Sequence, residues 1–346
     1  MKMIGVIFAG LSDQKKYDLI KKRTASSLPI AGNYHAIDFS LSCMVNSGVG
    51  KVAIISQYST RKLREYLTSS IWWGFGRKQG GLYLLSPEIT ESSREWYKGK
   101  VDSMYDNLEF FTESHEPYVV LAMGDGICKM DYNDVLNFHI EKNAEITAVC
   151  VKPPKGVDIK NYNEVTIEKG GRITGIIKNP RDKKEEYVTS GIYIIRRRLL
   201  IDILKKAKKG GRYSMVEDII IPRLCEGKVY AYIHEGYWSN LATEQAYMRC
   251  NMDFLKKEVM DELLGTEPQI YTRDYDNPPA KYLAHAKVSG SLIGDGAVID
   301  GKVTKSVIFA GATIEKGAVV KNSLVLPGAI VSEGEEVDGA IVKSKN

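Results

Sequence analysis

The 346-residue sequence has no run of about 18 apolar residues, the length that a membrane-spanning helix needs. It also shows no signal-peptide pattern, because an apolar strand pattern begins directly at Met3. We therefore expect neither membrane insertion nor secretion. With 44% hydrophobic and 26% charged residues, the composition is typical of a globular protein, and the length favours two domains.

Cysteine is scarce and has no paired spacing. The five cysteines are odd in number and form no CxxC motif, so we predict reduced core residues of a cytoplasmic protein and no zinc site. They are Cys43, Cys128, Cys150, Cys225 and Cys250. The net charge of +5 is small and is not gathered into a tail, which favours phosphorylated small molecules over nucleic acid as partners.

The first two-thirds of the chain alternates between strand and helix patterns. Apolar strand candidates are Met3–Phe8, Val52–Ser56, Tyr118–Met123 and Ile146–Val151. Tight apolar strands separated by helices predict an α/β, Rossmann-like domain whose mainly parallel sheet is covered on both faces. Later strand candidates are Glu164–Ile167, Arg172–Ile177, Gly191–Ile195 and Val229–Ile233, and the pattern over Thr243–Leu264 predicts one long helix.

The last part of the chain repeats every six residues. Its aliphatic grid comprises Val307, Val319, Val325, Val331 and Val337, with Ile308, Ile314, Val320 and Leu326 beside them. A period of six with glycine at the corners predicts a parallel β-helix, in which one aliphatic residue of each side points inward. We expect a domain over 1–265, a proline-marked linker over 266–283 and the β-helix over 284–346. Such solenoids commonly mediate assembly.

Several stretches resemble one enzyme family. These are NYHAIDFSLS, NSGVGKVAIISQY, REWYKGKVDSMYDN, GDGICKMDY and GYWSNLATEQAYMRCNMDFL, and they resemble glucose-1-phosphate adenylyltransferase (ADP-glucose pyrophosphorylase). The resemblance extends from Met3 to about Val337. It implies a nucleotidyltransferase domain followed by a left-handed β-helix. It also implies a reaction of glycogen biosynthesis, in which glucose 1-phosphate attacks the α-phosphorus of ATP and pyrophosphate leaves on Mg²⁺.

The chain departs from the family's triphosphate loop. Leu11 and Asp13 occupy two glycine positions, where a Cβ and a negative charge oppose a close approach to phosphate. Lys15 occupies the arginine position and lacks the planar guanidinium fork. In the following R-A-K-P motif Arg23 is kept, but Ala25 and Ser26 replace lysine and proline.

The sugar and metal motifs are altered as well. The family's E-K-P reads Lys178-Asn179-Pro180, and Asn240 stands where the second magnesium carboxylate is implied. In W-Y-x-G-T-A-D, Lys100 and Val101 replace threonine and alanine. The resemblance leaves Lys15, Arg23 and Asp125 as vestigial catalytic positions, Gly10, Gln57 and Gly124 for nucleotide, Tyr97 and Gly191 for sugar, and Asp125 for a weak or absent Mg²⁺.

Loss of a single well-placed cation or ligand typically lowers a rate about a hundredfold or more, so several losses predict a non-catalytic chain. The pattern is similar to the D-type regulatory subunit of Gram-positive bacteria. That likeness implies a heterotetramer with a catalytic subunit, with a homo-oligomer as the other assembly. ATP, glucose 1-phosphate or a phosphorylated effector remain candidate ligands, the last of them held by basic residues such as Lys21, Lys22 and Arg23.

Two alternatives stay open. In the first, the chain is a working adenylyltransferase in which Lys15 replaces the arginine and Asp125 alone holds Mg²⁺. In the second, the β-helix carries out acyl transfer. The sequence opposes this second alternative, because only His285 lies near the coils and no long loop interrupts the repeats to build a pocket.

Overall fold

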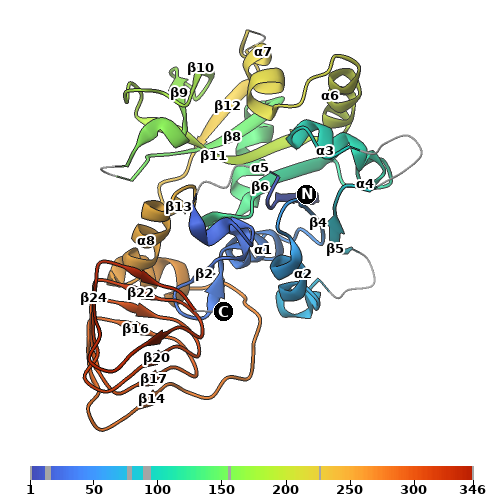
Figure 1. The fold of residues 1–346 in the computed structure, drawn as a ribbon. Coiled ribbons are helices and arrows are strands. Elements are labelled where there is room, and N and C mark those ends of the chain that lie inside the picture. The colour runs from blue at the N-terminus through green and yellow to red at the C-terminus, as the bar shows by residue number, and fades with distance from the viewer. Residues whose placement is uncertain are drawn as a thin grey trace.

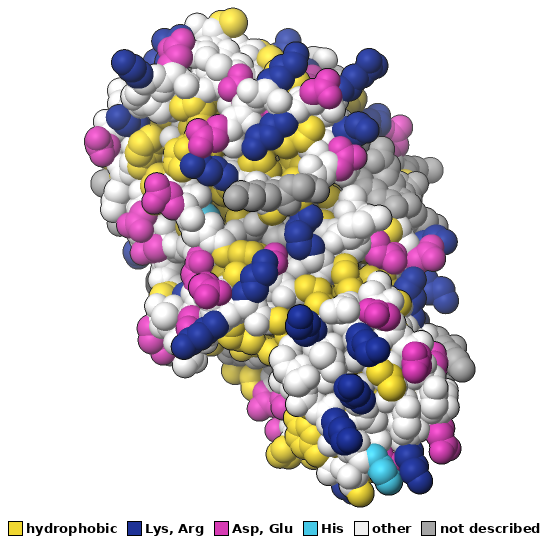
Figure 2. All heavy atoms as spheres, turned by 90° about the vertical axis from the view of Figure 1, so that its left-hand side faces the viewer, with side chains coloured by type: hydrophobic (Ala, Val, Ile, Leu, Met, Phe, Trp, Pro, Cys, Tyr) yellow, Lys and Arg dark blue, Asp and Glu magenta, His cyan; other side chains and the backbone are white. Residues whose placement is uncertain are grey.

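The computed structural model describes residues 2–11, 17–75, 80–88, 95–154, 157–225 and 227–344. Figure 1 shows an α/β part, blue to yellow, and a β-helix, orange to red, that lies beside helix α8 (Glu244–Asp253). Among the helices of the described ranges, none is long and apolar enough to cross a membrane. On the face drawn in Figure 2, basic side chains are spread over both parts and interspersed with acidic ones.

The centre of the α/β part is a parallel arrangement of four strands. β1 (Met3–Phe8) pairs with β4 (Lys51–Ile55) on one side and with β6 (Tyr118–Met123) on the other, and β5 (Gly81–Leu85) extends the sheet beyond β4. Side chains of β1 alternate between two buried clusters, one on each face of the sheet. Because both faces are covered, every residue of β1 is buried, which explains its unbroken apolar sequence.

The rest of this sheet mixes directions. β11 (Tyr187–Arg196) runs antiparallel to β6 and to β8 (Ile146–Val151), and β12 (Val229–Ile233) runs parallel to β8. β9 (Asn163–Ile167) and β10 (Ile173–Lys178) form an antiparallel pair next to β11. The predicted Rossmann-like fold with a mainly parallel central sheet is confirmed, and β11 begins four residues before the predicted strand.

The helices cover both faces of the sheet and connect its strands (Figure 1). The remaining α-helices of the described residues are α1 (Ala36–Asn46), α2 (Arg61–Tyr66), α3 (Lys100–Asp106), α4 (Leu108–Thr112), α5 (Tyr132–Glu141), α6 (Arg197–Lys209), α7 (Ile221–Leu224) and α9 (Lys257–Met260). Short 3₁₀ turns lie at Asp18–Ile20, Ala25–Ser27, Ser70–Trp73 and Ile159–Asn161, and π-helical turns lie at Met215–Ile220 and Asp261–Gly265. Two small antiparallel pairs join β2 (Pro29–Ile30) to β3 (Tyr34–His35) and β7 (Gly126–Cys128) to β13 (Trp238–Asn240).

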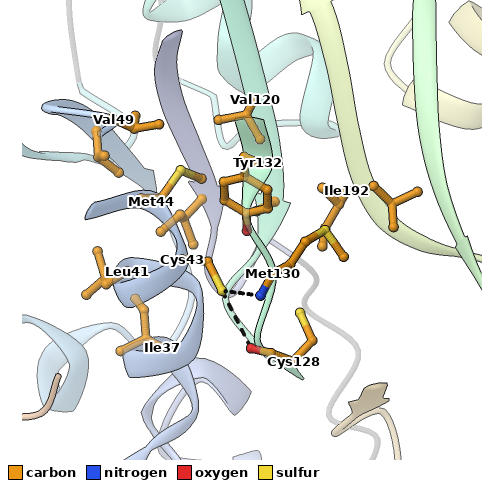
Figure 3. Packing of buried hydrophobic residues seen from close by; sticks show 14 of the residues in the cluster. Ile37, Leu41, Cys43, Met44, Val49, Val120, Cys128, Met130, Tyr132 and Ile192 are labelled. Atoms are coloured by element: carbon orange, nitrogen blue, oxygen red, sulfur yellow. Dashed lines mark hydrogen bonds between the residues drawn. The ribbon is translucent and has the colours of Figure 1, made fainter. Parts of the chain in front are cut away.

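Helix α1 packs against β7 through cysteine (Figure 3). The Sγ of Cys43 lies 3.6 Å from the Cys128 carbonyl oxygen and accepts from the Met130 amide at 3.4 Å. All five cysteines are free, and four of them are buried as predicted. The prediction is wrong for Cys225, which is exposed just beyond the short α7.

The long helix predicted over Thr243–Leu264 is wrong. Helix α8 begins at a Thr243 cap, whose side chain accepts from the Ala246 amide at 3.1 Å, and it ends at Asp253. Three successive i→i−3 backbone bonds then tighten the chain from Phe254 to Lys256. This turn buries Phe254 in the core, so tertiary packing overrides the continuous helical pattern.

The C-terminal part is a triangular solenoid made of three four-stranded parallel sheets. The strands are β14 (Lys281–Tyr282), β15 (Lys287–Ser289), β16 (Leu292–Ile293), β17 (Val298–Ile299), β18 (Lys302–Thr304), β19 (Val307–Ile308), β20 (Thr313–Ile314), β21 (Val319–Lys321), β22 (Leu324–Val325), β23 (Ile330–Val331), β24 (Glu336–Asp338) and β25 (Ile341–Val342). Its cross-strand partners are 15 residues apart in the first coils, as Leu292 with Val307, and 17 apart later, as Val307 with Leu324. The predicted left-handed hexapeptide β-helix is confirmed.

The strict six-residue grid is wrong in detail. In the interior of the coils, Ile308, Ile314 and Val320 are spaced six residues apart, but the next interior residue, Val325, comes five residues after Val320. The spacing is shorter there because this coil has 17 residues, one fewer than three six-residue repeats. Val307 and Leu326 point outward instead. They belong with Phe309 and Leu324 to a buried cluster shared with the α/β part. This sheet of the solenoid therefore docks on the first domain.

Candidate active-site pocket and interdomain cleft

The loop after β1 is fastened to the end of β4. The Gly10 carbonyl accepts from the backbone amides of Gln57 at 3.3 Å and Tyr58 at 3.0 Å. Gly10 has φ +80°, and a Cβ there would lie 2.5 Å from Thr24 Cγ2. Packing on Thr24 therefore requires this glycine whether or not nucleotide binds. Lys15 lies outside the described residues.

The side-chain amide of Gln57 is fully used inside the chain. Its Nε2 donates to the carbonyls of Leu11 at 3.0 Å and Tyr97 at 3.1 Å, and its Oε1 accepts from the Tyr97 amide at 2.8 Å. We call this arrangement the Gln57 clip. An amide offers two donors and an acceptor, and the clip engages each of these functions. Both Nε2 hydrogens are therefore taken, and an adenine donating to Oε1 would share that oxygen with the Tyr97 amide.

Tyr97 lies in the core beneath this clip. The residue is buried, its hydroxyl accepts from Asn107 Nδ2 at 2.9 Å, and burial raises the pKa of its phenol. Its neighbour Trp96 is exposed and stacks on Tyr58 with ring centroids 5.3 Å apart. The Tyr97 ring is therefore part of the core, and the stacked Trp96–Tyr58 pair lies beside it, with Trp96 exposed.

Gly124 and Asp125 follow β6 at the carboxyl edge of the sheet, where ligands bind in α/β folds. The Gly124 amide donates to the Phe8 carbonyl at 3.0 Å, and a Cβ on Gly124 would lie 2.6 Å from Ser26 Oγ. Asn240 pairs across the small sheet with Gly126, directly after Asp125. The fold therefore brings the two implied metal positions together, as one carboxylate and one amide.

Lys100 adds a cation to this edge. It begins α3, and its Nζ lies 2.9 Å from Met123 Sδ and 5.3 Å from the centroid of the Phe8 ring. Burial lowers the pKa of Lys100 to about 8, while the carboxylate of Asp125 acts in the opposite direction. From the sequence, Lys100 was evident only as a replaced threonine. The sequence did not reveal that the Lys100 side chain points toward the sheet edge, because this follows from α3 beginning at Lys100.

The predicted sugar positions are occupied by packing and ion pairing. Gly191 has φ +84°, and a Cβ there would lie 2.7 Å from Met123 Cγ, so the Met123 side chain lies directly against it. Lys178, where the family motif has glutamate, forms a 2.8 Å ion pair with Glu217, and both side chains are exposed. These contacts give Gly191 and Lys178 roles within the protein itself.

Arg23 lies elsewhere, in a cleft of about 990 Å³ between the first domain and the β-helix. Other basic side chains of its lining are Lys21, Lys22, Arg273 and Lys343. His35 also faces this cleft, and its buried Nδ1 has no hydrogen-bond partner. Burial first, and then the nearby Arg23 and Arg273, lower the pKa of His35 to about 3, so its ring is neutral at pH 7.

Both domains match known families. The family described as nucleotidyl transferase matches residues 4–257, and the GlmU-like C-terminal hexapeptide family matches residues 278–346. Glucose-1-phosphate adenylyltransferases of Bacillus thuringiensis (strain Al Hakam) and Bacillus anthracis are each 32% identical over 351 aligned residues, covering 99% of this chain and 92% of each relative. The chain belongs to the glucose-1-phosphate adenylyltransferase family.

For a member of the glucose-1-phosphate adenylyltransferase family, Mg²⁺ is the implied metal. Magnesium prefers hard oxygen ligands and usually one or two carboxylates. Here Asp125 is accompanied by the Asn240 amide and by the Lys100 ammonium, which opposes a second cation. Among the described residues, no group of three or more His, Cys, Asp and Glu side chains is placed to hold a metal ion. These residues do not fit the ion.

Proposed function

We propose that this chain is a regulatory, non-catalytic subunit that assembles with a catalytic glucose-1-phosphate adenylyltransferase. The observation that carries the proposal is the pairing of Asn240 with Gly126 beside Asp125, which replaces a two-carboxylate metal site with a single carboxylate. The reaction must stabilise charge on the α-phosphate and the leaving pyrophosphate, and a single missing ligand commonly lowers the rate about a hundredfold.

Two further features support the proposal. The Gln57 clip engages the amide that the family resemblance assigns to nucleotide, and Met123 packs on the glycine assigned to sugar. The scaffold around them is complete, with every residue of β1 buried and the β-helix docked through Phe309 and Leu324. A chain that works by assembly needs this shape and does not need the pocket.

We further propose that the interdomain cleft receives a phosphorylated effector. Its basic residues come from the loop before β2, the linker and the chain's last coil, so one anion would contact both domains. Bound there, the anion would bias how the β-helix sits on the first domain, which is a route to the partner subunit. Asp18 pairs with Lys21 and Lys343, and Arg273 Nη1 donates to the Glu65 and Tyr66 carbonyls. Lys22 and Arg23 are therefore the first cations to test.

The test compares the isolated chain, the catalytic subunit and their mixture for ADP-glucose formation from ATP and glucose 1-phosphate. We expect no turnover by the chain alone, co-elution with the catalytic subunit, and a changed kcat or KM in the mixture. Robust turnover by the isolated chain that is abolished by Asp125→Ala would establish the catalytic alternative instead.

The cleft is tested in the same mixture with inorganic phosphate and a panel of sugar phosphates as probes. Arg23→Ala should weaken the response to the active probe, whereas Lys142→Ala, at a half-buried position just after α5 and outside the cleft lining, should leave it unchanged. Equal responses of both variants would contradict the proposed effector site.

A further inference from the structure

The ammonium of Lys100 lies against the ends of the two central strands. Phe8, beneath the ammonium at 5.3 Å, is the last residue of β1, and Met123, whose Sδ is 2.9 Å from Nζ, is the last residue of β6. An aromatic face attracts a cation, and this attraction strengthens away from water. Phe8 is 3% exposed, so the contact holds the ammonium at the sheet edge rather than in solvent.

The groups that interact with Asp125 include a cation and a phenol. Lys100 acts on the Asp125 carboxylate electrostatically. The Tyr17 phenol is partly buried, interacts electrostatically with both Asp125 and Glu244, and donates to the Leu241 carbonyl at 2.8 Å. Asn240, next to Leu241, contributes a neutral amide whose oxygen lies 3.4 Å from the Ala242 amide. Lys100 is thus a cation that acts on Asp125, while Glu244 is a further carboxylate near Tyr17.

A divalent cation entering this site would meet a carboxylate that already interacts with a positive charge held at the sheet edge by Met123 and Phe8. We propose that the Lys100 ammonium takes the place of the divalent cation beside Asp125, so that this pocket binds no Mg²⁺. The replacement keeps Asp125 compensated at the sheet edge without a metal, since an uncompensated carboxylate there would be costly.

This inference rests on the same altered metal site as the proposed function, but different measurements test the two. Asp125-dependent metal binding by the wild-type chain would contradict the inference, whereas the turnover and assembly assays decide the proposed function. Turnover by the isolated chain without Asp125-dependent metal binding would contradict the proposed function and leave the inference in place.

The experiment titrates the full-length chain with Mn²⁺, a paramagnetic substitute for Mg²⁺, and follows bound metal by electron paramagnetic resonance. The wild type should show no binding that Asp125→Asn removes. Lys100→Met keeps an unbranched side chain on the Phe8 ring but removes the charge, and it should bind Mn²⁺ at concentrations at which the wild type shows no Asp125-dependent binding. Adding Asp125→Asn should abolish this gain.

Lys100→Arg is the matched control, because it keeps the positive charge and should bind no more Mn²⁺ than the wild type. Circular dichroism and thermal melting verify that each variant is folded. Asp125-dependent Mn²⁺ binding by the wild type overturns the proposal, and this comparison does not depend on how the Lys100 variants fold. A folded Lys100→Met that gains no Asp125-dependent binding overturns it equally.

Discussion

Asp38 is a buried carboxylate whose removal should have a large and specific effect on stability. Its side chain is 0% exposed and accepts from the His35 amide at 2.8 Å, the Tyr66 hydroxyl at 2.7 Å, Trp73 Nε1 at 3.2 Å and the Thr272 hydroxyl at 2.7 Å. The backbone donor comes from β3, and the three side-chain donors come from α2, the turn after it and the linker, so Asp38 connects α1 to the segment that leads into the β-helix.

Asp38→Ala deprives these donors of their common acceptor. Each buried donor left unsatisfied costs about 1–3 kcal/mol. The two hydroxyls, of Tyr66 and Thr272, are 3.0 Å apart and can pair with each other, which limits the loss. We therefore count two orphaned groups and expect the free energy of unfolding to fall by about 3–5 kcal/mol. Asp38→Asn keeps an acceptor oxygen and should cost less.

Urea unfolding followed by tryptophan fluorescence and circular dichroism measures this loss, and Trp73 reports directly from the site. Burial raises the pKa of Asp38 to about 7, so ionisation above that pH costs the folded wild type stability. The comparison is therefore made at pH 6, where the folded carboxyl is mostly protonated and the loss on Asp38→Ala should exceed that at pH 8. Asp202→Ala, on an exposed position of α6, is the control and should change stability by less than about 0.5 kcal/mol. A loss below about 1 kcal/mol for Asp38→Ala would refute the reasoning.

Three further predictions concern the clip, a buried histidine and the domain interface. Gln57→Glu cannot donate to the two carbonyls of the clip and should lower the urea-measured free energy of unfolding by about 2–4 kcal/mol; a change under 1 kcal/mol contradicts the clip. Burial lowers the pKa of His139 to about 4, so between pH 6.5 and 4 only the unfolded chain gains this proton, and stability should fall by about 3 kcal/mol as the pH drops. His139→Asn should flatten that slope in urea titrations at stepped pH, and parallel slopes count against it. Phe309→Ala should cost about 3 kcal/mol and expose the linker to protease, whereas Ile308→Ala should weaken the coil interior without selective linker cleavage.

The strands of the first domain were predictable because buried parallel strands are continuous apolar runs. The bounds of β1, β6 and β8 coincide with the predicted ranges. The glycine corners of the β-helix were predictable for a local reason, since residues such as Gly311 adopt φ +68°. The apolar runs and the glycine corners are both determined by a few neighbouring residues, so the sequence alone reveals them.

What depends on distant packing was not predictable. The sequence near Phe254 does not indicate the turn that ends α8, because the ring packs on residues far away in the chain, such as Leu28 and Phe39. Likewise, the periodicity could not tell that Val307 faces the first domain while Ile308 faces the coil interior. In the candidate site, the Gln57 clip joins three separate segments, so only the folded chain reveals that the amide is engaged.

The pocket residues that match the family and those that depart from it differ in what their atoms touch. Gly10 and Gly124 match, and at both positions a Cβ would collide with Thr24 or Ser26, so packing alone explains them. The departures at Lys178 and Asn240 leave side chains with partners inside the protein, an ion pair with Glu217 and a 3.4 Å contact with the Ala242 amide. A matching glycine is therefore no evidence for nucleotide binding here, because the same residue would be needed in an empty pocket. A chain required to keep its shape for a partner, and released from binding substrate, would change in this way.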